Sequence, residues 1–241
     1  MRALDKHLNF VKTLCFLDLE GTQFSHEMIA VGAVKVNIRK DGTVKKIHRG
    51  MYTLVKAKNR VGKVVTDLTG ITDAQLKKDG VPFRVAMEQL KRYMGRDFTK
   101  CKYVTFGSHD LRIIAQSLAY NLDVKKDDVQ ILIKHNFDLS EFASQYVKDE
   151  NNNTYSLSNF LKIFGVEFKG TQHNALADAL NLVYLYDAFL KNRDIVKQEY
   201  LKVLANMRHL PEPIHEAINE IINNKVVTLE QFENYVDESL K

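Results

Sequence analysis

The sequence predicts an α/β domain built on a mixed sheet, followed by a small helical extension. Three apolar strand-like segments come first, and helices alternate with short strands afterwards. Near residue 192 the pattern of apolar and polar residues changes. The chain has 241 residues, of which 45% are hydrophobic and 27% charged, so it can bury a core without staples. This balance excludes disordered, collagen-like and coiled-coil chains. We place the domain at 1–191 and the extension at 192–241.

The first three predicted strands form an antiparallel meander. Residues 13–19 (TLCFLDL) are nearly all apolar until Asp18, which is typical of a buried strand with a polar end. Residues 28–38 predict the second strand. Asp41-Gly42 is a hairpin turn signal, after which residues 44–55 predict the third strand.

Helices and short strands alternate in the next part of the chain. Pro82 suits the first turn of a helix that ends at Gly95, and residues 103–106 predict a fourth strand. Two segments, 129–133 and 137–139, compete for the fifth strand, and the sequence leaves that choice open. Further helices are predicted over 139–147, 156–164 and 174–190.

The net charge is unevenly distributed. The chain carries 35 basic and 30 acidic residues, hence 35 − 30 = +5, while residues 35–63 alone hold ten basic residues and one acid, or +9. This basic stretch is either an edge strand protected by lysines or a track for substrate phosphates, with Lys45, Lys46 and Arg49 as its candidates. Residues 192–241 sum to 6 − 9 = −3, which disfavours a second nucleic-acid module there. Packing back on the domain is the favoured role of this extension, and self-association or a protein partner are the alternatives.

Other features concern the cellular setting. Cys15 and Cys101 lack the spacing of a metal site, which predicts buried free thiols in a reducing compartment. No apolar stretch approaches the roughly 20 residues of a membrane span, and the N-terminal charges interrupt any signal-like run. We expect a cytoplasmic protein without a membrane segment.

Acidic residues stand at the ends of two predicted strands. Asp18 and Glu20 are two positions apart, so strand alternation places both carboxylates on one side of the sheet. Burying two like charges together is costly unless a cation lies between them, but taken alone the pair is better explained by solvated carboxylates at a strand end. Asp110 follows the strand at 103–106, where α/β sheets place their sites, or it complements a helix dipole.

His173 and Asp178 lie on either side of a predicted helix start. Five residues apart on one helix, they would be rotated by about 140° and could not share a face. Asn174 is a favourable N-cap residue. If the helix begins there, His173 lies in the preceding loop and is free to lean towards Asp178.

The order of these residues resembles the DEDDh (DnaQ-like) exonucleases of the RNase H-like fold. The resemblance covers roughly residues 13–191 and rests on 16–22 (FLDLEGT), the Asp110 segment and the His173-x4-Asp178 pattern. Residues 68–72 (LTGIT) and 156–161 (SLSNFL) resemble neighbouring segments of such enzymes. The Eri-type and sporulation-kinase-inhibitor-type branch is the most similar. This resemblance implies a five-stranded mixed sheet flanked by helices.

The resemblance also implies an activity and a cofactor. Such enzymes hydrolyse terminal phosphodiesters from the 3′ end of single strands and release nucleoside monophosphates, with RNA or short oligonucleotides slightly preferred over DNA here. Two divalent ions, Mg²⁺ or Mn²⁺, would be held by Asp18, which bridges them, Glu20 and Asp178 on the first, and Asp110 on the second. His173 would take a proton from the attacking water.

Substrate contacts follow from the same resemblance. The implied residues are Gly21 and Thr22, through backbone N–H groups near the scissile phosphate, and Leu68, Thr69, Gly70 and Ile71 at the terminal nucleotide. A simple turn would also explain the Thr-Gly pair. Two other functions share this fold, a regulatory protein-binding module and a DNA proofreading subunit with a polymerase partner. All five catalytic positions carry the expected residue types, which favours an enzyme.

Overall fold

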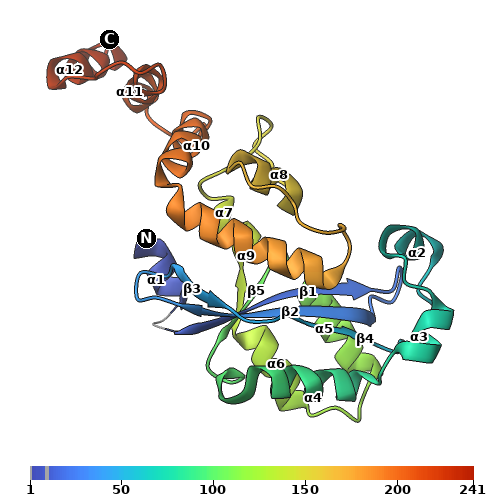
Figure 1. Ribbon diagram of the computed structural model, residues 1–241. Helices are drawn as coiled ribbons and strands as arrows, with labels where there is room; N and C mark the ends of the chain where they lie inside the picture. Colours follow the sequence, from blue (N-terminus) through green and yellow to red (C-terminus); the bar gives the residue numbers. More distant parts are fainter. Residues whose placement is uncertain (1, 9–10) are drawn as a thin grey trace.

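The computed structural model describes residues 2–8 and 11–241, and a mixed sheet lies at its centre (Figure 1). The strands follow the order β3-β2-β1-β5-β6, and β4 also pairs with β2. They are β1 (Thr13–Gly21), β2 (Met28–Ile38), β3 (Val44–Ile47), β4 (Met51–Leu54), β5 (Lys102–Thr105) and β6 (Asn136–Asp138). The pairs β1–β2, β2–β3 and β2–β4 are antiparallel, whereas β1–β5 and β5–β6 are parallel. The predicted meander followed by parallel strands is confirmed.

Two details of the predicted sheet are corrected. The expected third strand over 44–55 is divided into β3 and β4, so the sheet has six strands among the described residues. The break lies at 48–50, where Gly50 approaches α9 so closely that an added Cβ would lie 2.4 Å from a Leu176 methyl carbon. Of the two candidates for the last strand, 129–133 is wrong, because it lies within a helix, and β6 covers 136–138. A short apolar run does not distinguish a strand from a buried helix face.

Helices cover both faces of the sheet (Figure 1). One face packs against α1, α7, α8 and α9, and the other against α4, α5 and α6. The helices of the domain are α1 (Arg2–Leu8), α2 (Lys63–Thr69), α3 (Asp73–Asp79), α4 (Phe83–Met94), α5 (His109–Tyr120), α6 (Lys126–Lys134), α7 (Leu139–Ala143), α8 (Leu157–Ile163) and α9 (Ala175–Lys191). The helix expected over 139–147 is shorter than predicted, and α1, α2 and α3 were not predicted.

Alternation along β1 decides which face carries which side chains. Leu14 and Phe16 are buried with α9, whereas Cys15 and Leu17 are buried with α4 and α5. The same alternation directs Asp18, two residues beyond Phe16, to the α9 side. The face with α9 is therefore where the chain can bring acids from a strand and a helix together.

Gly32 in β2 allows α9 to begin directly on the sheet. A Cβ added at Gly32 would lie 2.1 Å from the carbonyl carbon of Ala175, far closer than any side chain can approach. Only glycine fits such a close approach of two backbones. The contact brings the first turn of α9 down onto β2, the strand beside β1.

The C-terminal extension consists of α10 (Arg193–Ala205), α11 (Glu212–Ile222) and α12 (Leu229–Ser239). Of these, α10 packs on the domain, since Val196 is buried in its core and the Tyr200 ring lies 5.1 Å from that of Tyr146. In turn, α11 packs on α10 and α12 on α11, and Figure 1 shows both leaving the domain. The expected packing of the extension onto the domain is thus confirmed for α10 and wrong for most of α11 and α12.

The structure also describes the two cysteines and the lengths of the helices. Cys15 and Cys101 are buried free thiols, as predicted. Among residues 2–8 and 11–241, no helix combines the length and the apolar character needed to cross a membrane.

Candidate active site

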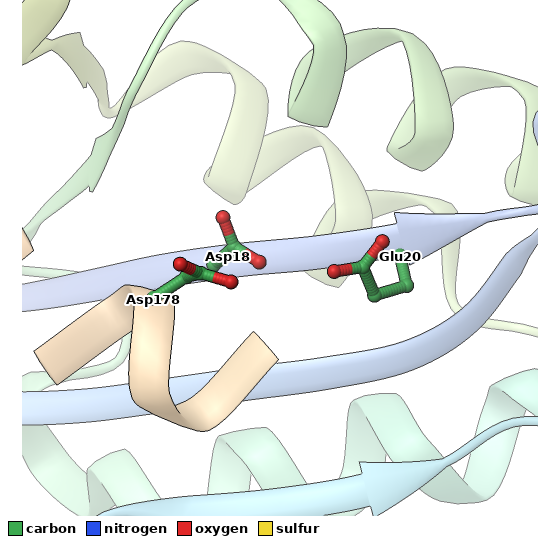
Figure 2. A group of neighbouring side chains, drawn as sticks. All are labelled: Asp18, Glu20 and Asp178. Atoms are coloured by element: carbon green, nitrogen blue, oxygen red, sulfur yellow. The ribbon is translucent and has the colours of Figure 1, made fainter. Parts of the chain in front are cut away.

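Three carboxylates converge where β1 passes under the start of α9. Asp18 and Glu20 project from β1 and Asp178 from α9 (Figure 2). One carboxylate oxygen from each lies within 4.8 Å of the others, and all three side chains are half-buried. Within the described part of the chain, this is the one group of three or more acidic, histidine or cysteine side chains arranged closely enough to share a metal ion.

The start of α9 places Asp178. The Asn174 side chain accepts a hydrogen bond from the backbone N–H of Ala177 at 3.1 Å and so caps the helix as predicted. Asp178 then falls in the first turn. Because Gly32 holds that turn against the sheet, Asp178 comes within reach of Asp18 although 160 residues separate them.

Asp110 lies in the same site but outside the group of three. It is buried in the first turn of α5, and its carboxylate accepts the backbone N–H of Leu19 at 2.9 Å. Leu19 is the residue between Asp18 and Glu20. Asp110 therefore also fixes the backbone that carries two of the other carboxylates.

His173 occupies the loop before α9, as predicted. Its φ is +63°, a left-handed conformation that is uncommon for residues other than glycine and is often found at functional sites. Its backbone also forms a hydrogen bond with the Asp178 carboxylate. His173 is exposed at the side of the cavity, and these two residues are thus linked directly.

Burial raises the pKa values of all four carboxyl groups, and repulsion among these acids raises the pKa values of Asp18 and Glu20 further. Burial and the neighbouring charges of Asp110 and Asp178 raise the pKa of Asp18 well above its usual value. Burial, then Asp178 and Asp110, raise the pKa of Glu20 to about 8. Burial raises the pKa of Asp110 to about 7, against the opposing hydrogen bond from Leu19, and that of Asp178 to about 6, against the opposing charge of His173.

All five predicted catalytic residues line one cavity of about 260 Å³. Eight further residues line the cavity, and the sequence did not identify them as part of the site. They are Leu19, Phe106, His109, Ser156, Leu157, Ser158, Phe168 and Gln172. His109 directly precedes Asp110, and Gln172 directly precedes His173, so both could have been predicted from their position next to a motif residue. Phe168 comes from the irregular segment between α8 and α9, where no periodicity points to a site.

The structure gives Thr22 a role within a turn. Its backbone N–H donates to the carbonyl of Glu27 at 2.8 Å, and its hydroxyl accepts the Glu27 N–H at 2.9 Å. The backbone N–H that was expected to reach a phosphate is thus donated to Glu27 in this structure, and the substrate role of Thr22 stays a prediction. Gly21 is buried at the end of β1, and an added Cβ would lie 2.9 Å from Ile113, which explains its small size without a substrate.

The segment 68–71 is the end of a helix where a loop was expected. Leu68 and Thr69 close α2, Gly70 follows with φ at +72°, and Ile71 is buried beside Ala175. The segment belongs to a unit that meets the end of β1, because the backbone N–H of Gln23 donates to the carbonyl of Val61, next to α2, at 2.8 Å. Leu68 is exposed, so it can still meet a ligand.

Lys45 and Lys46 lie away from the cavity. Lys46 pairs with Asn37, which pairs with Thr13 at the start of β1, five residues before Asp18. This separation corresponds to about 17 Å along the strand. Arg49 follows in the β3–β4 connection, where its carbonyl accepts the Tyr93 hydroxyl. The structure therefore brings none of the three to the carboxylates, and the position of β3 at the sheet edge favours the edge-strand interpretation.

The fold has counterparts among solved structures. The nuclease domain of 3′hExo, a DEDDh family member bound to rAMP, superposes with a TM-score of 0.63 and 19% identity, covering 78% of this chain and 95% of that one. Exonuclease I of E. coli in complex with a dA16 oligonucleotide gives a TM-score of 0.58 and 15% identity, covering 81% of this chain and 44% of that one.

Sequence comparisons agree with the fold. "ERI1 exoribonuclease 2" from Xenopus laevis is 22% identical over 217 residues, which cover 80% of this chain and only 30% of that protein. The sequence model of the RNase_T family, described as exonuclease, matches residues 15–186, a span that contains all four acids and His173. The resemblance drawn from the motifs is confirmed, and the chain belongs to the RNase_T family of exonucleases.

Proposed function

We propose that the protein removes nucleoside monophosphates from the 3′ end of single-stranded nucleic acid by metal-assisted hydrolysis. The observation that carries this proposal is the group of three carboxylates within 4.8 Å of one another, in the cavity that His173 also lines. Family membership supplies the class of reaction. The clustered carboxylates and the position of His173 support the assignment of residues to that reaction.

The donor set suits Mg²⁺ or Mn²⁺. Carboxylate oxygens are the ligands these ions prefer, and no cysteine lies in the cavity lining to favour zinc. A cation would also relieve the repulsion that raises the carboxyl pKa values. We assign Asp18, Glu20 and Asp178 to a first ion and Asp18 and Asp110 to a second. Bound divalent ions activate water and neutralise charge on the leaving oxygen.

His173 is the proposed general base. It lies at the cavity wall, its backbone is bonded to Asp178, and its side chain is open to solvent. A neutral imidazole at that position can accept the proton of the attacking water and pass it to bulk solvent. His173 precedes the N-cap Asn174 and so lies outside α9, where its ring can turn towards the carboxylates.

RNA or a short oligonucleotide is the proposed substrate, in preference to DNA. The names of the relatives support it in part: one is called an exoribonuclease and one solved domain holds rAMP, whereas Exonuclease I was solved with DNA. Phe24 follows β1 and is 82% exposed. An exposed aromatic ring beside the site can stack on a base of a single strand, irrespective of sequence.

The test uses matched RNA and DNA strands, labelled at the 3′ or the 5′ end, with Mn²⁺ or with EDTA. We expect early release of a labelled monophosphate from the 3′-labelled strand and a shortening ladder from the 5′-labelled one, with Mn²⁺ only. Asp18→Ala should abolish both, and His173→Ala should lose most turnover while keeping Mn²⁺ binding. A shortening ladder from the 3′-labelled strand, or an Asp18→Ala variant as active as the parent, would refute the proposal.

Two other roles on the same fold predict different outcomes. A regulatory module would bind a partner without hydrolysing any strand, and a proofreading subunit would need a polymerase. The clustered carboxylates favour the enzyme, because a binding module has no use for three repelling acids in a cavity. From the sequence, we also propose that the protein is cytoplasmic and that the extension has a partner.

A further inference from the structure

The basic stretch of the sequence divides into two surfaces in the structure. Lys45 and Lys46 lie in β3, away from the cavity. Residues 56–60 line a separate groove of about 270 Å³, near the C-terminal end of β1. The groove is lined by Lys56, Ala57, Lys58, Asn59, Arg60, Asp73, Leu76 and Lys77. We propose that this groove binds the phosphates of the substrate strand on the 5′ side of the cleaved bond, an inference that rests on the proposed exonuclease function.

The charge of the groove is strongly positive and largely uncompensated. Lys56, Arg60 and Lys77 are exposed, and the ion pairs found among residues 2–8 and 11–241 include none of them. Asp73 is the single acid of the lining, and its carboxylate accepts the backbone N–H of Val61 at 2.9 Å. Cations that lack protein partners and surround a cavity are suited to bind anions such as phosphodiesters.

The remaining lysine is part of the wall. The Lys58 ammonium donates a hydrogen bond to the carbonyl of Tyr120 at the end of α5. It therefore ties the groove to the helix that carries Asp110. We leave it unchanged in the experiment, because its loss would disturb the fold of the groove together with its charge.

Glu27 fixes the backbone of the groove. Its buried carboxylate accepts the N–H groups of Lys58 and Asn59, each at 2.9 Å, and the Asn59 side-chain amide at 2.9 Å. On the other side, the Lys56 N–H donates to the carbonyl of Val81 at 2.8 Å. The segment 56–60 thus has its shape before a ligand arrives, which reduces the entropy lost on binding.

The groove is close enough to the cavity to share one strand. Gln23 is three residues from Glu20 and hydrogen-bonds Val61, the neighbour of Arg60. Chain geometry limits the distance from Glu20 to Arg60 to about 20 Å. A strand with one phosphate per roughly 3.4 Å or more covers this distance within about six nucleotides. Exposed Phe24 follows Gln23 in the connection between β1 and β2.

The experiment measures binding by fluorescence anisotropy in EDTA, where hydrolysis cannot proceed. The variant is Lys56→Gln/Arg60→Gln/Lys77→Gln. The matched control is Lys125→Gln/Lys126→Gln/Lys134→Gln, at the N-cap and along α6, which removes the same charge from exposed positions elsewhere. For a 12-nucleotide RNA, each phosphate contact contributes about 0.7 to the slope of log affinity against log salt. We expect the groove variant to lower this slope by about two, so that between 50 and 200 mM salt it loses roughly 16-fold less affinity than the parent.

A trinucleotide tests whether the effect of the groove variant depends on the length of the strand. It has only two phosphates, so at most one can reach the groove while the other lies at the carboxylates, and we expect the groove variant to lower its salt slope by no more than about 0.7. The proposal is overturned if the groove variant keeps the parent's slope for the 12-mer, if both triple variants lower it equally, or if Lys45→Gln/Lys46→Gln/Arg49→Gln lowers it instead. An acidic peptide that competes with the 12-mer at equal affinity would assign the groove to a protein and overturn it as well.

Hydrolysis separates this inference from the proposed function. The parent protein is incubated with Mn²⁺ and either the trinucleotide or the 12-mer. If neither is degraded, the exonuclease proposal fails, whereas the anisotropy result still decides whether the groove binds a strand. If both are degraded, we expect the groove variant to raise KM for the 12-mer about tenfold at 0.15 M salt and to leave kcat within twofold. An unchanged KM contradicts the groove alone.

Discussion

Residues 13–191 of the domain and the extension from residue 193 are both rich in regular structure. They differ in whether the stabilising contacts join residues far apart or close together in the sequence. In the domain, the clustered acids are positioned by contacts between residues far apart in sequence, such as Asp110 with Leu19 or Ala175 with Gly32. In the extension, α11 and α12 contact mainly their neighbours along the chain, and α12 buries no residue. Precise placement of side chains follows from long-range contacts, and helix formation alone does not provide it.

Identical substitutions in the first turns of two consecutive helices should give the largest contrast. Asp178→Asn in α9 removes a proposed metal ligand, so we expect Mn²⁺-dependent hydrolysis to fall by about 10²–10³-fold or more. Asp194→Asn in α10 changes the same residue type on an exposed surface and should leave the rate within twofold. Steady-state rates on a labelled RNA strand decide it, and equal losses in both variants would refute the contrast.

A single methyl group should damage the domain more than large changes damage the extension. Gly32→Ala forces β2 and the start of α9 apart, because the new Cβ would lie 2.1 Å from the Ala175 backbone. We expect the free energy of unfolding to fall by about 1–3 kcal/mol or more, together with Mn²⁺ affinity, since Asp178 moves with the helix. Urea unfolding and Mn²⁺ titration provide the two measurements. A stable variant with unchanged Mn²⁺ affinity would show that the backbone contact is not required.

The pH dependence of stability should distinguish the two regions with a smaller effect. Burial and repulsion raise the pKa of Glu20 to about 8 in the folded protein, against about 4.3 for an unperturbed glutamate. Its protonated form is thus favoured by folding, and this stabilisation is complete below pH 4 and lost as the pH rises through 8. In metal-free buffer, Glu20→Gln should therefore gain stability over the parent between pH 5.5 and 8.5.

The control for this measurement is Glu233→Gln in α12, an exposed side chain of the extension. Its unfolding midpoint should follow the parent's at every pH. Adding Mn²⁺ should reverse the order, because the ion binds the ionised carboxylates of the parent and stabilises its folded state. If Glu20→Gln and the parent kept a constant difference from pH 5.5 to 8.5, the raised pKa of Glu20 would be excluded.

Removal of α11 and α12 should have the smallest effect on catalysis. Deleting residues 207–241 keeps α10, whose Val196 and Tyr200 contact the domain. We expect turnover of an RNA strand within twofold of the full chain, and an unfolding midpoint lowered by only a few degrees. A loss beyond tenfold would show that the extension takes part in the reaction or in substrate binding.

The sequence predicted those parts of the site that depend on local periodicity. Alternation placed Asp18 and Glu20 on one side of β1, and the capping residue Asn174 placed the start of α9. The capping box of Thr228 and Gln231, found at the start of α12, depends on local spacing in the same way. Such signals involve residues only a few positions apart, which is why a single sequence is sufficient for them.

The missed features depend on contacts across the chain. Nothing near Gly32 indicates that α9 will meet it, and nothing near Glu27 indicates that its carboxylate will bind the backbone of Lys58. The groove combines the segment 56–60 with Lys77 from α3, which was not predicted as a helix. The predicted phosphate track was placed in β3 because a charge count along the sequence cannot separate two surfaces.

The buried carboxylate of Glu27 has a consequence for amide hydrogen exchange. Lys58 and Asn59 have exposed side chains in a segment without regular structure, where backbone amides ordinarily exchange with solvent rapidly. Their N–H groups nevertheless point inward to one carboxylate. Deuterium would therefore enter this short segment as slowly as it enters a strand of the sheet, and its exchange rate would report opening of the contact between the groove and Glu27, which lies directly before β2.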